Sequence, residues 1–430
     1  MKIIREDRID AFIRTLQQRA SFSVREDEIQ RVVRKIISDV QRHGDRAVMR
    51  YTEKFDSVRP GKLSIGKKEI ESASKNVDKN FLKSLKESAR RIREFHKRQK
   101  ERSWRYSAGG ITLGQIIRPL ERVGVYVPGG KAAYPSTVLM NVIPAQVAGV
   151  REIALCVPAP GGELNPHVAA AVKLLGVDEV YMAGGAQAVA ALAFGTETIK
   201  KVDKIVGPGN IYVAVAKKMV FGQVGIDMVA GPSEILIIAD GTSDPSFIAA
   251  DLLSQAEHDE MASSVLITDS ADLAGKVKAE LARRIKNLKR RDIVRKSLNR
   301  YGAIIITQDL RSAVDIANRI APEHLEVMTG KPAALLPRIK NAGAVFLGKW
   351  SPEPLGDYSA GPNHTLPTGG TARFSSPLGV YDFMKRTSLI NASRSGFAGL
   401  AQAVETLSEV EGLQAHAETV RVRLVNKNKP

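Results

Sequence analysis

A regular alternation of short apolar runs with longer amphipathic segments dominates the middle of this 430-residue chain. The apolar runs are bounded by Gly and Pro, which is typical of strands, and the segments between them have helical spacing. Strands that alternate with helices form βαβ units and a parallel sheet. The predicted strands are VGVYVP (123–128), EIALCVP (152–158), VDEVYMAGG (177–185), KIVGPG (204–209), EILIIAD (234–240), SSVLITD (263–269), GAIIITQD (302–309) and GAVFLG (343–348).

These strands fall into two successive series, which predicts an α/β fold with two incomplete Rossmann-like, doubly wound halves. We expect the first half to cover residues 106–232 and the second half to cover residues 233–380. Apolar residues recur at three- and four-residue intervals in residues 1–105, which predicts a helical N-terminal segment. From residue 381 the pattern is helical again, so residues 381–430 are expected to form a C-terminal helical arm.

Composition excludes several classes of protein. No stretch approaches the roughly 18 consecutive apolar residues of a membrane span, and the charged N-terminus lacks the apolar core of a signal peptide. A cytoplasmic protein with no membrane partner is therefore expected. The single cysteine, Cys156, rules out a thiolate zinc cluster within one chain and is expected to be a small buried hydrophobe, because it lies in a strand-like apolar run.

The formal net charge of +18 raises nucleic acid as a possible partner. Two runs, residues 90–105 and 283–300, carry much of this charge, and both combine basic residues with helical apolar spacing. We interpret them as solvated basic helix faces, with a nucleic-acid site as the alternative. Aromatic residues are only 5% of the chain, which disfavours stacking platforms for bases. The same charge would attract anionic cofactors.

The histidines give a short list of candidate functional residues. His43 and His96 lie in basic helical surroundings and are predicted to be surface residues. Gln255 and His258 are three residues apart at the end of a helix that Asp244 can cap, so they are predicted to share one helix face. A carbonyl oxygen and an imidazole nitrogen that converge there can bind a divalent metal, although a plain surface position is the simpler interpretation.

Glu323 and His324 form an adjacent acid and imidazole after Pro322. Such a pair offers two proton acceptors with different pKa values. Adjacent residues on a strand point in opposite directions, so both can reach one substrate only from a loop or a helix start, which the proline favours. A surface pair is the alternative interpretation.

A long segment rich in Pro, Gly, Ser and Thr, residues 351–380, contains Asp357 and His364. Long ordered loops are commonly functional, and Asp is a good ligand for zinc and a good partner for an imidazole. For this pair a functional and a purely structural role stay equally open. His416 and Glu411 lie near the C-terminal helix, where surface positions are expected.

Glycine-rich turns next to the predicted strands favour a nucleotide or phosphate site, although the G-x-G-x-x-G fingerprint is missing. A parallel sheet places its ligand loops at such positions, and glycine lets the backbone approach a phosphate closely. Plain strand-to-helix turns are the alternative. The turns are YVPGGK (126–131), MAGGAQ (182–187), VGPGN (206–210) and VAGPSE (229–234).

Taken together, these segments closely resemble the histidinol dehydrogenase family. The resemblance runs in order from about residue 120 to 390, and EGLQAHA extends it to the C-terminal helix, whereas residues 1–105 contribute less distinctive evidence. The matching blocks are RVGVYVPGGKAAYPSTVLMNVIPAQVAGV, GGAQAVAALAFGT, KIVGPGNIYVAVAKK, IDMVAGPSEILIIAD, DLLSQAEHD, IAPEHLE and LGDYSAGPNHTLPTGGTARF.

The resemblance implies the oxidation of L-histidinol to L-histidine through L-histidinal with two NAD, at the end of histidine biosynthesis. It also implies a homodimer with one zinc per subunit. The implied NAD contacts are Tyr126, Gln187 and Asn210. The implied zinc ligands are Gln255, His258, Asp357 and His416.

The resemblance further implies that His324 deprotonates the hydroxyl group during hydride transfer and that Glu323 activates water for the aldehyde step. Zinc would clamp the substrate, and His364 would help to orient it. In this family the C-terminal helix reaches into the other subunit, so Glu411 and His416 are expected to complete the partner's site. The implied substrate contacts are Ser233, Gln255, His258, His324, Asp357, Glu411 and His416.

Two other classes of function stay open at this point. A zinc hydrolase with Glu323 as its base would turn over without NAD. A basic nucleic-acid-binding protein with a decayed dehydrogenase site would bind nucleic acid in a salt-sensitive way through the two arginine-rich helices. Neither class explains the glycine-rich turns together with the candidate ligands.

Overall fold

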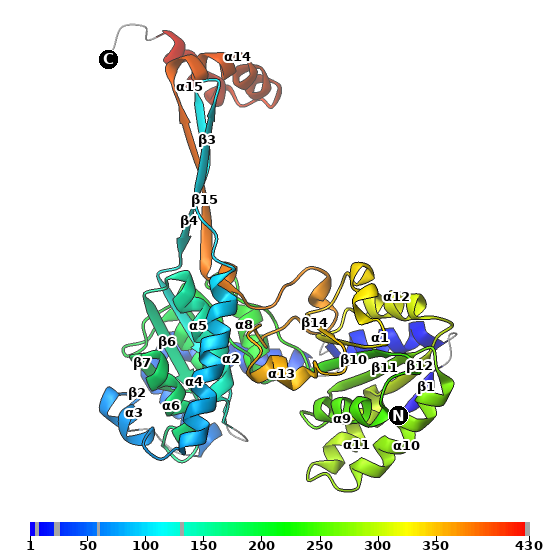
Figure 1. Cartoon of the computed structure of the whole chain (residues 1–430). Helices are drawn as coiled ribbons and strands as arrows, with labels where there is room; N and C mark the ends of the chain where they lie inside the picture. Colours follow the sequence, from blue (N-terminus) through cyan, green and yellow to red (C-terminus); the bar gives the residue numbers. More distant parts are fainter. Residues whose placement is uncertain (5–7, 21–25, 58–60, 130–132, 426–430) are drawn as a thin grey trace. The chain divides into compact units, whose positions relative to one another are not determined.

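The computed structural model describes residues 1–4, 8–20, 26–57, 61–129 and 133–425. The chain divides into two compact units (Figure 1). The first unit comprises Met1–Gln99 and Leu120–Phe383, and the second comprises Lys100–Pro119 and Met384–Pro430. The four segments drawn from the sequence do not follow these two units, because Lys100–Pro119 belongs with the C-terminal part of the chain. The division into four segments stays a prediction.

The first unit contains two mainly parallel sheets, as predicted, and each sheet has six strands. In the first sheet the strand order is β2-β7-β6-β5-β8-β9, so the order reverses at β5, which pairs in parallel with β6 on one side and β8 on the other. Among the strands that the structure describes in this sheet, β2 alone is antiparallel to its neighbour. The strands are β2 (Ser64–Ile65), β5 (Arg122–Tyr126), β6 (Glu152–Val157), β7 (Glu179–Met182), β8 (Lys204–Val206) and β9 (Gly225–Ile226).

The second sheet has the order β1-β12-β11-β10-β13-β14, and all its pairs are parallel. Its order reverses at β10, which makes it doubly wound like the first sheet. Neither β1 nor β13 was predicted, because β1 is only three residues long and the buried strand β13 contains the polar residues His324 and Glu326. The strands are β1 (Lys2–Ile4), β10 (Glu234–Ala239), β11 (Ser263–Thr268), β12 (Ala303–Ile306), β13 (His324–Met328) and β14 (Ala344–Leu347).

Apolar residues on both faces explain why the strands of the second sheet have no polar alternation. Leu236 and Ile238 pack in one core cluster, whereas Ile235 and Ile237 pack in another cluster on the opposite face. Parallel strands buried on both faces have this continuous apolar pattern. The first sheet packs against α2, α7 and α8 in a third cluster.

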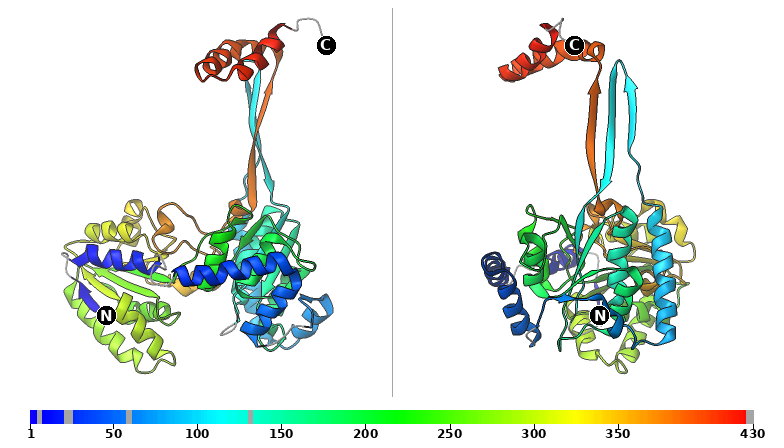
Figure 2. Two further views of the ribbon diagram at one scale, coloured as in Figure 1. Left: turned by 180° about the vertical axis from the view of Figure 1, so that it is seen from behind. Right: turned by 90° about the vertical axis from the view of Figure 1, so that its left-hand side faces the viewer.

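The helices of the first unit connect and cover the strands (Figures 1 and 2). They are α1 (Ile9–Ala20), α2 (Glu26–Asp56), α3 (Lys67–Ala73), α4 (Lys79–Lys97), α5 (Pro135–Ala148), α6 (Pro166–Leu175), α7 (Gly185–Phe194), α8 (Ile211–Val220), α9 (Pro245–Ala256), α10 (Ala271–Ile285), α11 (Arg291–Tyr301), α12 (Leu310–Ile320) and α13 (Glu353–Tyr358). Short 3-10 turns are η2 (Pro332–Ala334), η3 (Leu336–Arg338), η4 (Thr371–Arg373) and η5 (Val380–Phe383). No helix among the described residues is long and apolar enough to cross a membrane.

The second unit corrects the expectation of a wholly helical C-terminal arm. Its three-stranded antiparallel sheet has the order β15-β4-β3, and β15 pairs with β4 along all nine of its residues (Figure 2). Most side chains of β15 are exposed, so no apolar alternation marks it as a strand. The elements are β3 (Trp104–Ala108), β4 (Ile111–Pro119), β15 (Met384–Ala392), α14 (Arg394–Val410) and α15 (Gln414–Val425).

Of three predictions about single residues, two are confirmed and one is wrong. Cys156 is fully buried in β6, and burial raises the pKa of its thiol to about 12, so its predicted role as a small core residue is confirmed. His43 is exposed as predicted, but the surface position predicted for His96 is wrong. His96 continues the buried face of α4 that includes Ala89 and Ile92, and its Nδ1 lies 2.7 Å from the side-chain oxygen of Gln99.

Candidate active site

Glu323 and His324 lie at the amino end of β13, which pairs with the edge strand β14. Both side chains are buried, and His324 Nδ1 is 3.7 Å from Glu323 Oε2. The prediction of a loop or a helix start is confirmed for Glu323, which precedes the strand, and is wrong for His324, which is the first residue of the strand. The alternative of a surface pair is wrong, because both side chains are buried. The two side chains still lie close together. Successive side chains within a strand point to opposite faces of the sheet, but Glu323 precedes the strand, so this rule does not apply to it.

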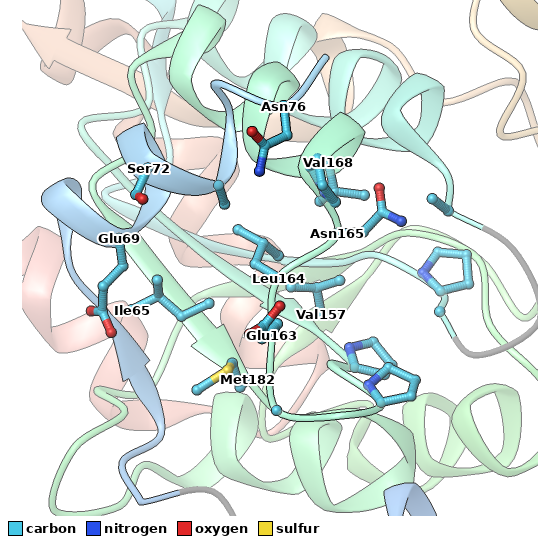
Figure 3. A pocket seen from close by; sticks show the side chains of 18 residues that line it. Ile65, Glu69, Ser72, Asn76, Val157, Glu163, Leu164, Asn165, Val168 and Met182 are labelled. Carbon is cyan, nitrogen blue, oxygen red and sulfur yellow. The ribbon is translucent and has the colours of Figure 1, made fainter.

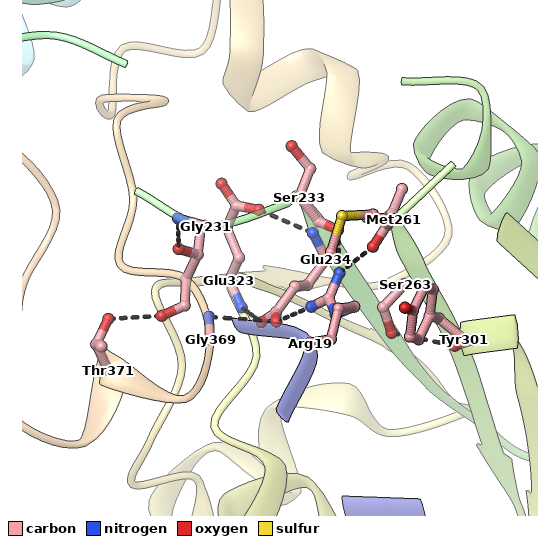
Figure 4. A network of polar contacts seen from close by, with 12 residues as sticks. Arg19, Gly231, Ser233, Glu234, Met261, Ser263, Tyr301, Glu323, Gly369 and Thr371 are labelled. Atoms are coloured by element: carbon pink, nitrogen blue, oxygen red, sulfur yellow. Dashed lines mark hydrogen bonds and ion pairs between the residues drawn. The ribbon is translucent and has the colours of Figure 1, made fainter. Parts of the chain in front are cut away.

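The neighbouring strand β10 holds this pair through Glu234, its first residue (Figure 4). The Glu234 backbone N–H donates to Glu323 Oε2 at 2.9 Å, and the Glu323 N–H donates to Glu234 Oε2 at 3.3 Å. His324 Nδ1 lies 2.8 Å from the Glu234 carbonyl oxygen. A carbonyl oxygen only accepts, so Nδ1 carries the proton of the neutral ring and Nε2 keeps its lone pair.

Arg19, near the end of α1, holds Glu234 in turn (Figure 4). Its guanidinium forms a buried ion pair with the Glu234 carboxylate and also donates to the carbonyl oxygens of Ser233 and Met261. Burial raises the pKa of Glu234, although Arg19 opposes this shift. The pKa of Glu323 is raised well above its usual range, mainly by burial and then by the charge of Glu234.

The other side of the His324 ring faces carboxylates of α13. His324 Nε2 is 3.8 Å from Glu353 Oε1 and 3.8 Å from Asp357 Oδ1. Glu353 and Asp357 are four residues apart on one helix, so their side chains share a face. Together with His324 they offer ligand atoms within 4.8 Å of one another, which is a grouping that can hold a metal ion.

Glu353 was not predicted as a site residue, although its four-residue spacing from Asp357 would place both side chains on one face of a helix. Its side chain is buried, and burial together with the nearby Asp357 raises the pKa of this carboxyl to about 10. Arg19 and Glu234 were missed as well, since nothing in the sequence connects residues so far apart. Pairing of β10 with β13 is what brings Glu234 beside Glu323.

The predicted ligands Gln255 and His258 differ in their surroundings. Gln255 is buried on α9, and its Oε1 has no hydrogen-bond partner among the described residues. The helix ends at Ala256, so the prediction that His258 closes it is corrected by two residues, while Asp244 caps its start as predicted. His258 is exposed, and its N–H donates to the Gln255 carbonyl oxygen at 3.2 Å.

His258 and His364 both affect the pKa of His324. Burial lowers the pKa of His324, Asp357 opposes this, and the nearby His258 and His364 lower it further. His364 Nδ1 lies 3.1 Å from the carbonyl oxygen of Asp357, so this pair from the long loop is joined. His324, Asp357 and His364 line one cavity of about 500 Å³. Burial lowers the pKa of His364 too, which favours a neutral ring.

The remaining predicted site residues are placed as follows. Ser233 is half-buried and directly precedes Glu234. Glu411 caps the C-terminal end of α14 and His416 lies on α15, so both belong to the second unit, and both are exposed.

The three predicted NAD contacts lie around the first sheet, at or after the carboxyl ends of its strands. Tyr126 ends β5, and its hydroxyl accepts a hydrogen bond from the Gly185 N–H at the start of α7 at 3.1 Å. Gln187 is buried on the same helix, and its Oε1 has no partner among the described residues. Asn210 is exposed and caps α8 by accepting from the Tyr212 N–H at 3.0 Å.

Known proteins of one family are similar to this chain along nearly its whole length. A family model described as Histidinol dehydrogenase matches residues 19–424. Histidinol dehydrogenase from Geobacter sulfurreducens is 52% identical over 425 residues, which are 98% of this chain and 99% of the relative. The enzyme of that name from Aquifex aeolicus is 54% identical over 400 residues, 93% of each chain.

A solved structure extends this likeness to the fold. The crystal structure of histidinol dehydrogenase from Elizabethkingia anophelis matches with a TM-score of 0.89 and 38% identity, and the match covers 93% of both chains. Family model, sequence identity and structure thus agree with one another. The chain therefore belongs to the histidinol dehydrogenase family, whose members are oxidoreductases.

Proposed function

We propose that this protein oxidises L-histidinol to L-histidine through L-histidinal, with NAD as the oxidant and one zinc ion per subunit. The observation that carries the proposal is the orientation of His324. Its Nδ1–H is engaged by the Glu234 carbonyl oxygen, while Nε2 is buried and has no hydrogen-bond partner among the described residues. An imidazole held in this way presents a lone pair to a substrate hydroxyl.

The donor set suits zinc. Gln255 Oε1 is a buried oxygen that lacks a hydrogen bond, and His258 and Asp357 add an imidazole and a carboxylate. Zinc accepts nitrogen and oxygen ligands of these types, and no thiolate is required. When bound, zinc would supply a positive charge that holds the nitrogen donors of the substrate in place.

The two bases would act in succession. In the first step His324 Nε2 would take the proton of the substrate hydroxyl, and NAD, when bound, would be the acceptor for the hydride that leaves the same carbon. In the second step Glu323 would take a proton from the water that adds to the aldehyde, and the carbon of the resulting hydrate would lose a second hydride, for which a second NAD would be the acceptor. The raised pKa of Glu323 makes its ionised form a stronger base, and the hydrogen bond from the Glu234 N–H aims one of its oxygens.

The proposed NAD site also suits its ligand. The buried Gln187 Oε1 lacks a partner among the described residues, and the hydroxyl of Tyr126, at the end of β5, contacts the start of α7, where backbone N–H groups favour a phosphate. When bound, NAD would supply the hydride acceptor.

The second unit contributes to the proposal through Glu411 and His416. Both are exposed, and we propose that they complete the site of the partner subunit in a homodimer. His416 of the partner subunit would then be the fourth zinc ligand. A cytoplasmic location and a place in histidine biosynthesis belong to the same proposal, because they follow from the family's pathway.

A direct assay tests the proposal. The purified protein is mixed with L-histidinol and NAD, and NADH is followed at 340 nm with and without a metal chelator. We expect NADH to form and its rate to fall after the chelator has removed the metal, with recovery when zinc is added back. No NADH in the presence of zinc would refute the activity. A near-normal rate after verified removal of the metal would refute the role of zinc.

A further inference from the structure

One buried ion pair of the first unit has no part in the chemistry described so far. Lys217 lies on α8 and pairs with Asp227, which follows β9, and each of these two side chains is only 1% exposed. Burying two charges is costly, and such a pair is often no more stabilising than apolar side chains of similar volume. Stability alone therefore does not explain why a lysine occupies this position.

Both charged groups bind the backbone of a single residue, Gly207. The ammonium group of Lys217 donates to the Gly207 carbonyl oxygen at 2.9 Å, and the Gly207 N–H donates to Asp227 Oδ2 at 2.8 Å. The other oxygen of Asp227 accepts the ion pair and the Met228 N–H, at 2.6 Å from the latter. Hydrogen bonds to charged groups are the strong ones, so the pair fixes both polar groups of Gly207.

Gly207 also packs directly against the end of β5. Its φ is +110°, and a Cβ atom at this position would collide with the carbonyl oxygen of Tyr126. Three residues later, Asn210 caps α8. The turn 207–210 therefore runs from the backbone of Tyr126 to Asn210, which are two of the three proposed NAD contacts, and the Lys217–Asp227 pair holds its first residue.

The pair itself is not placed to touch a ligand. Neither Lys217 nor Asp227 lines the cavity of about 790 Å³ at the carboxyl ends of β6 and β7 (Figure 3), and neither lines the cavity of about 500 Å³ beside His324. Their side chains are too deeply buried for a direct contact from solvent. Any effect of the pair on a ligand must therefore be transmitted through Gly207.

We propose that Lys217 and Asp227 are positioning residues for NAD, which act by holding the turn 207–210 through the backbone of Gly207. A turn that already has its ligand-binding conformation need not be ordered when the ligand binds. The pair should therefore strengthen the binding of NAD and leave the binding of L-histidinol unchanged. This inference rests on the proposed use of NAD.

Calorimetric titration with NAD tests the inference on the zinc-loaded protein, with L-histidine, the proposed product, present to fill the substrate site. We expect Lys217→Met to weaken NAD binding about tenfold, because roughly one residue of freed backbone must then be ordered on binding. The matched control is Arg122→Met. Arg122 is a buried cation of the same sheet, but it pairs with Glu152 and Glu179 at the amino end of β5. The control should bind NAD as the wild type does.

A double variant separates positioning from a loss of stability. Lys217→Met leaves the Asp227 charge buried without a partner, whereas Lys217→Met/Asp227→Leu removes both charges together. The double variant should therefore unfold at a higher denaturant concentration than Lys217→Met. It lacks both contacts to Gly207, so its binding of NAD should still be about tenfold weaker than that of the wild type.

Steady-state rates give a second readout. In both variants the KM for NAD should rise about tenfold, while the KM for L-histidinol and the kcat at saturating NAD stay within about twofold of the wild type. If the wild type binds NAD and both variants match it in titration and in KM, the inference is wrong while the proposed function stands. A joint change of kcat and both KM values would also overturn it, because it would indicate a general structural role. If the wild type does not bind NAD, the proposed use of NAD fails and the inference fails with it.

Discussion

His324 shows how a backbone contact fixes the chemistry of one residue. The Glu234 carbonyl oxygen accepts from Nδ1, and this bond selects the tautomer with a free Nε2. Burial lowers the pKa of the ring, so the ring stays neutral and able to accept a proton near pH 7. The adjacent Glu323 has the opposite shift from the same cause, because burial disfavours the charged form of either group.

Separate assays of the two half-reactions should distinguish the two bases. We expect His324→Asn to slow histidinol oxidation by about 10²- to 10⁴-fold, which is the usual contribution of a general base. Glu323→Gln should slow histidinal oxidation by a similar factor and affect the alcohol step much less. Equal losses in both steps for both variants would contradict separate roles. Titration with NAD controls for intact folding.

Cys156 should be chemically inert in the folded protein. Burial raises the pKa of the thiol to about 12, and only the thiolate reacts with alkylating reagents. We expect no labelling by iodoacetamide at pH 8 in the native state and complete labelling after denaturation, as read by intact mass. Rapid labelling of the native enzyme would contradict the buried position in β6.

At the scale of elements, the ion pair between Arg19 and Glu234 connects α1 to the amino end of β10. Removing one partner of a buried pair leaves the other charge without compensation and costs about 3–5 kcal/mol. We therefore expect Arg19→Met to lower the free energy of unfolding by about that amount. Arg50→Met is the control, because Arg50 pairs with Asp39 at the surface, where such a pair contributes about 0–1 kcal/mol. Equal losses in chemical denaturation would count against the buried pair.

A second buried contact, between Asp251 of α9 and Glu326 of β13, predicts a pH dependence. Burial raises the pKa of Asp251 to about 6, and burial with the nearby Asp251 raises the pKa of Glu326 well above its usual range. The usual pKa of these carboxyls is about 4, so above about pH 4 the folded state binds more protons than the unfolded state. The contribution of this pair to the free energy of unfolding therefore decreases as the pH rises through 6.

Glu326→Gln should remove most of this slope, since an amide stands in for the protonated carboxyl. The expected result is a variant that gains stability relative to the wild type at pH 8 and gains little at pH 5, measured by denaturation midpoints. The same difference at both pH values would mean that the Asp251–Glu326 contact does not carry the effect.

Sequence patterns predicted elements well where burial follows a simple period. All eight apolar runs that were predicted to be strands are strands of the two sheets. Continuous apolar runs are typical of parallel strands that are covered on both faces. β13 was missed because its buried residues include Glu326, and β15 was missed because its side chains are mostly exposed. Gln255 and Asp357 could be identified as candidates from the sequence. Glu234 and Glu353 could not, because only the pairing of β10 with β13 and the position of α13 bring them close to His324.

At the scale of the whole molecule, the proposal makes each active site depend on two chains. Co-expressed chains that carry His416→Ala and Glu323→Ala separately should form mixed dimers with one intact site, because one pairing brings together an unchanged Glu323 and an unchanged His416. We expect about half of the wild-type activity per mixed dimer, whereas each pure variant dimer should be nearly inactive. An inactive mixed dimer would contradict shared sites.

The central claim is a four-electron oxidation of one substrate at one site. Complete turnover of a known amount of L-histidinol with excess NAD tests it most directly, with NADH counted by absorbance and the product separated by chromatography. The account predicts two NADH for each histidinol consumed and L-histidine as the only accumulated product. One NADH per histidinol with the aldehyde as the end product, or no NADH at all, would contradict it.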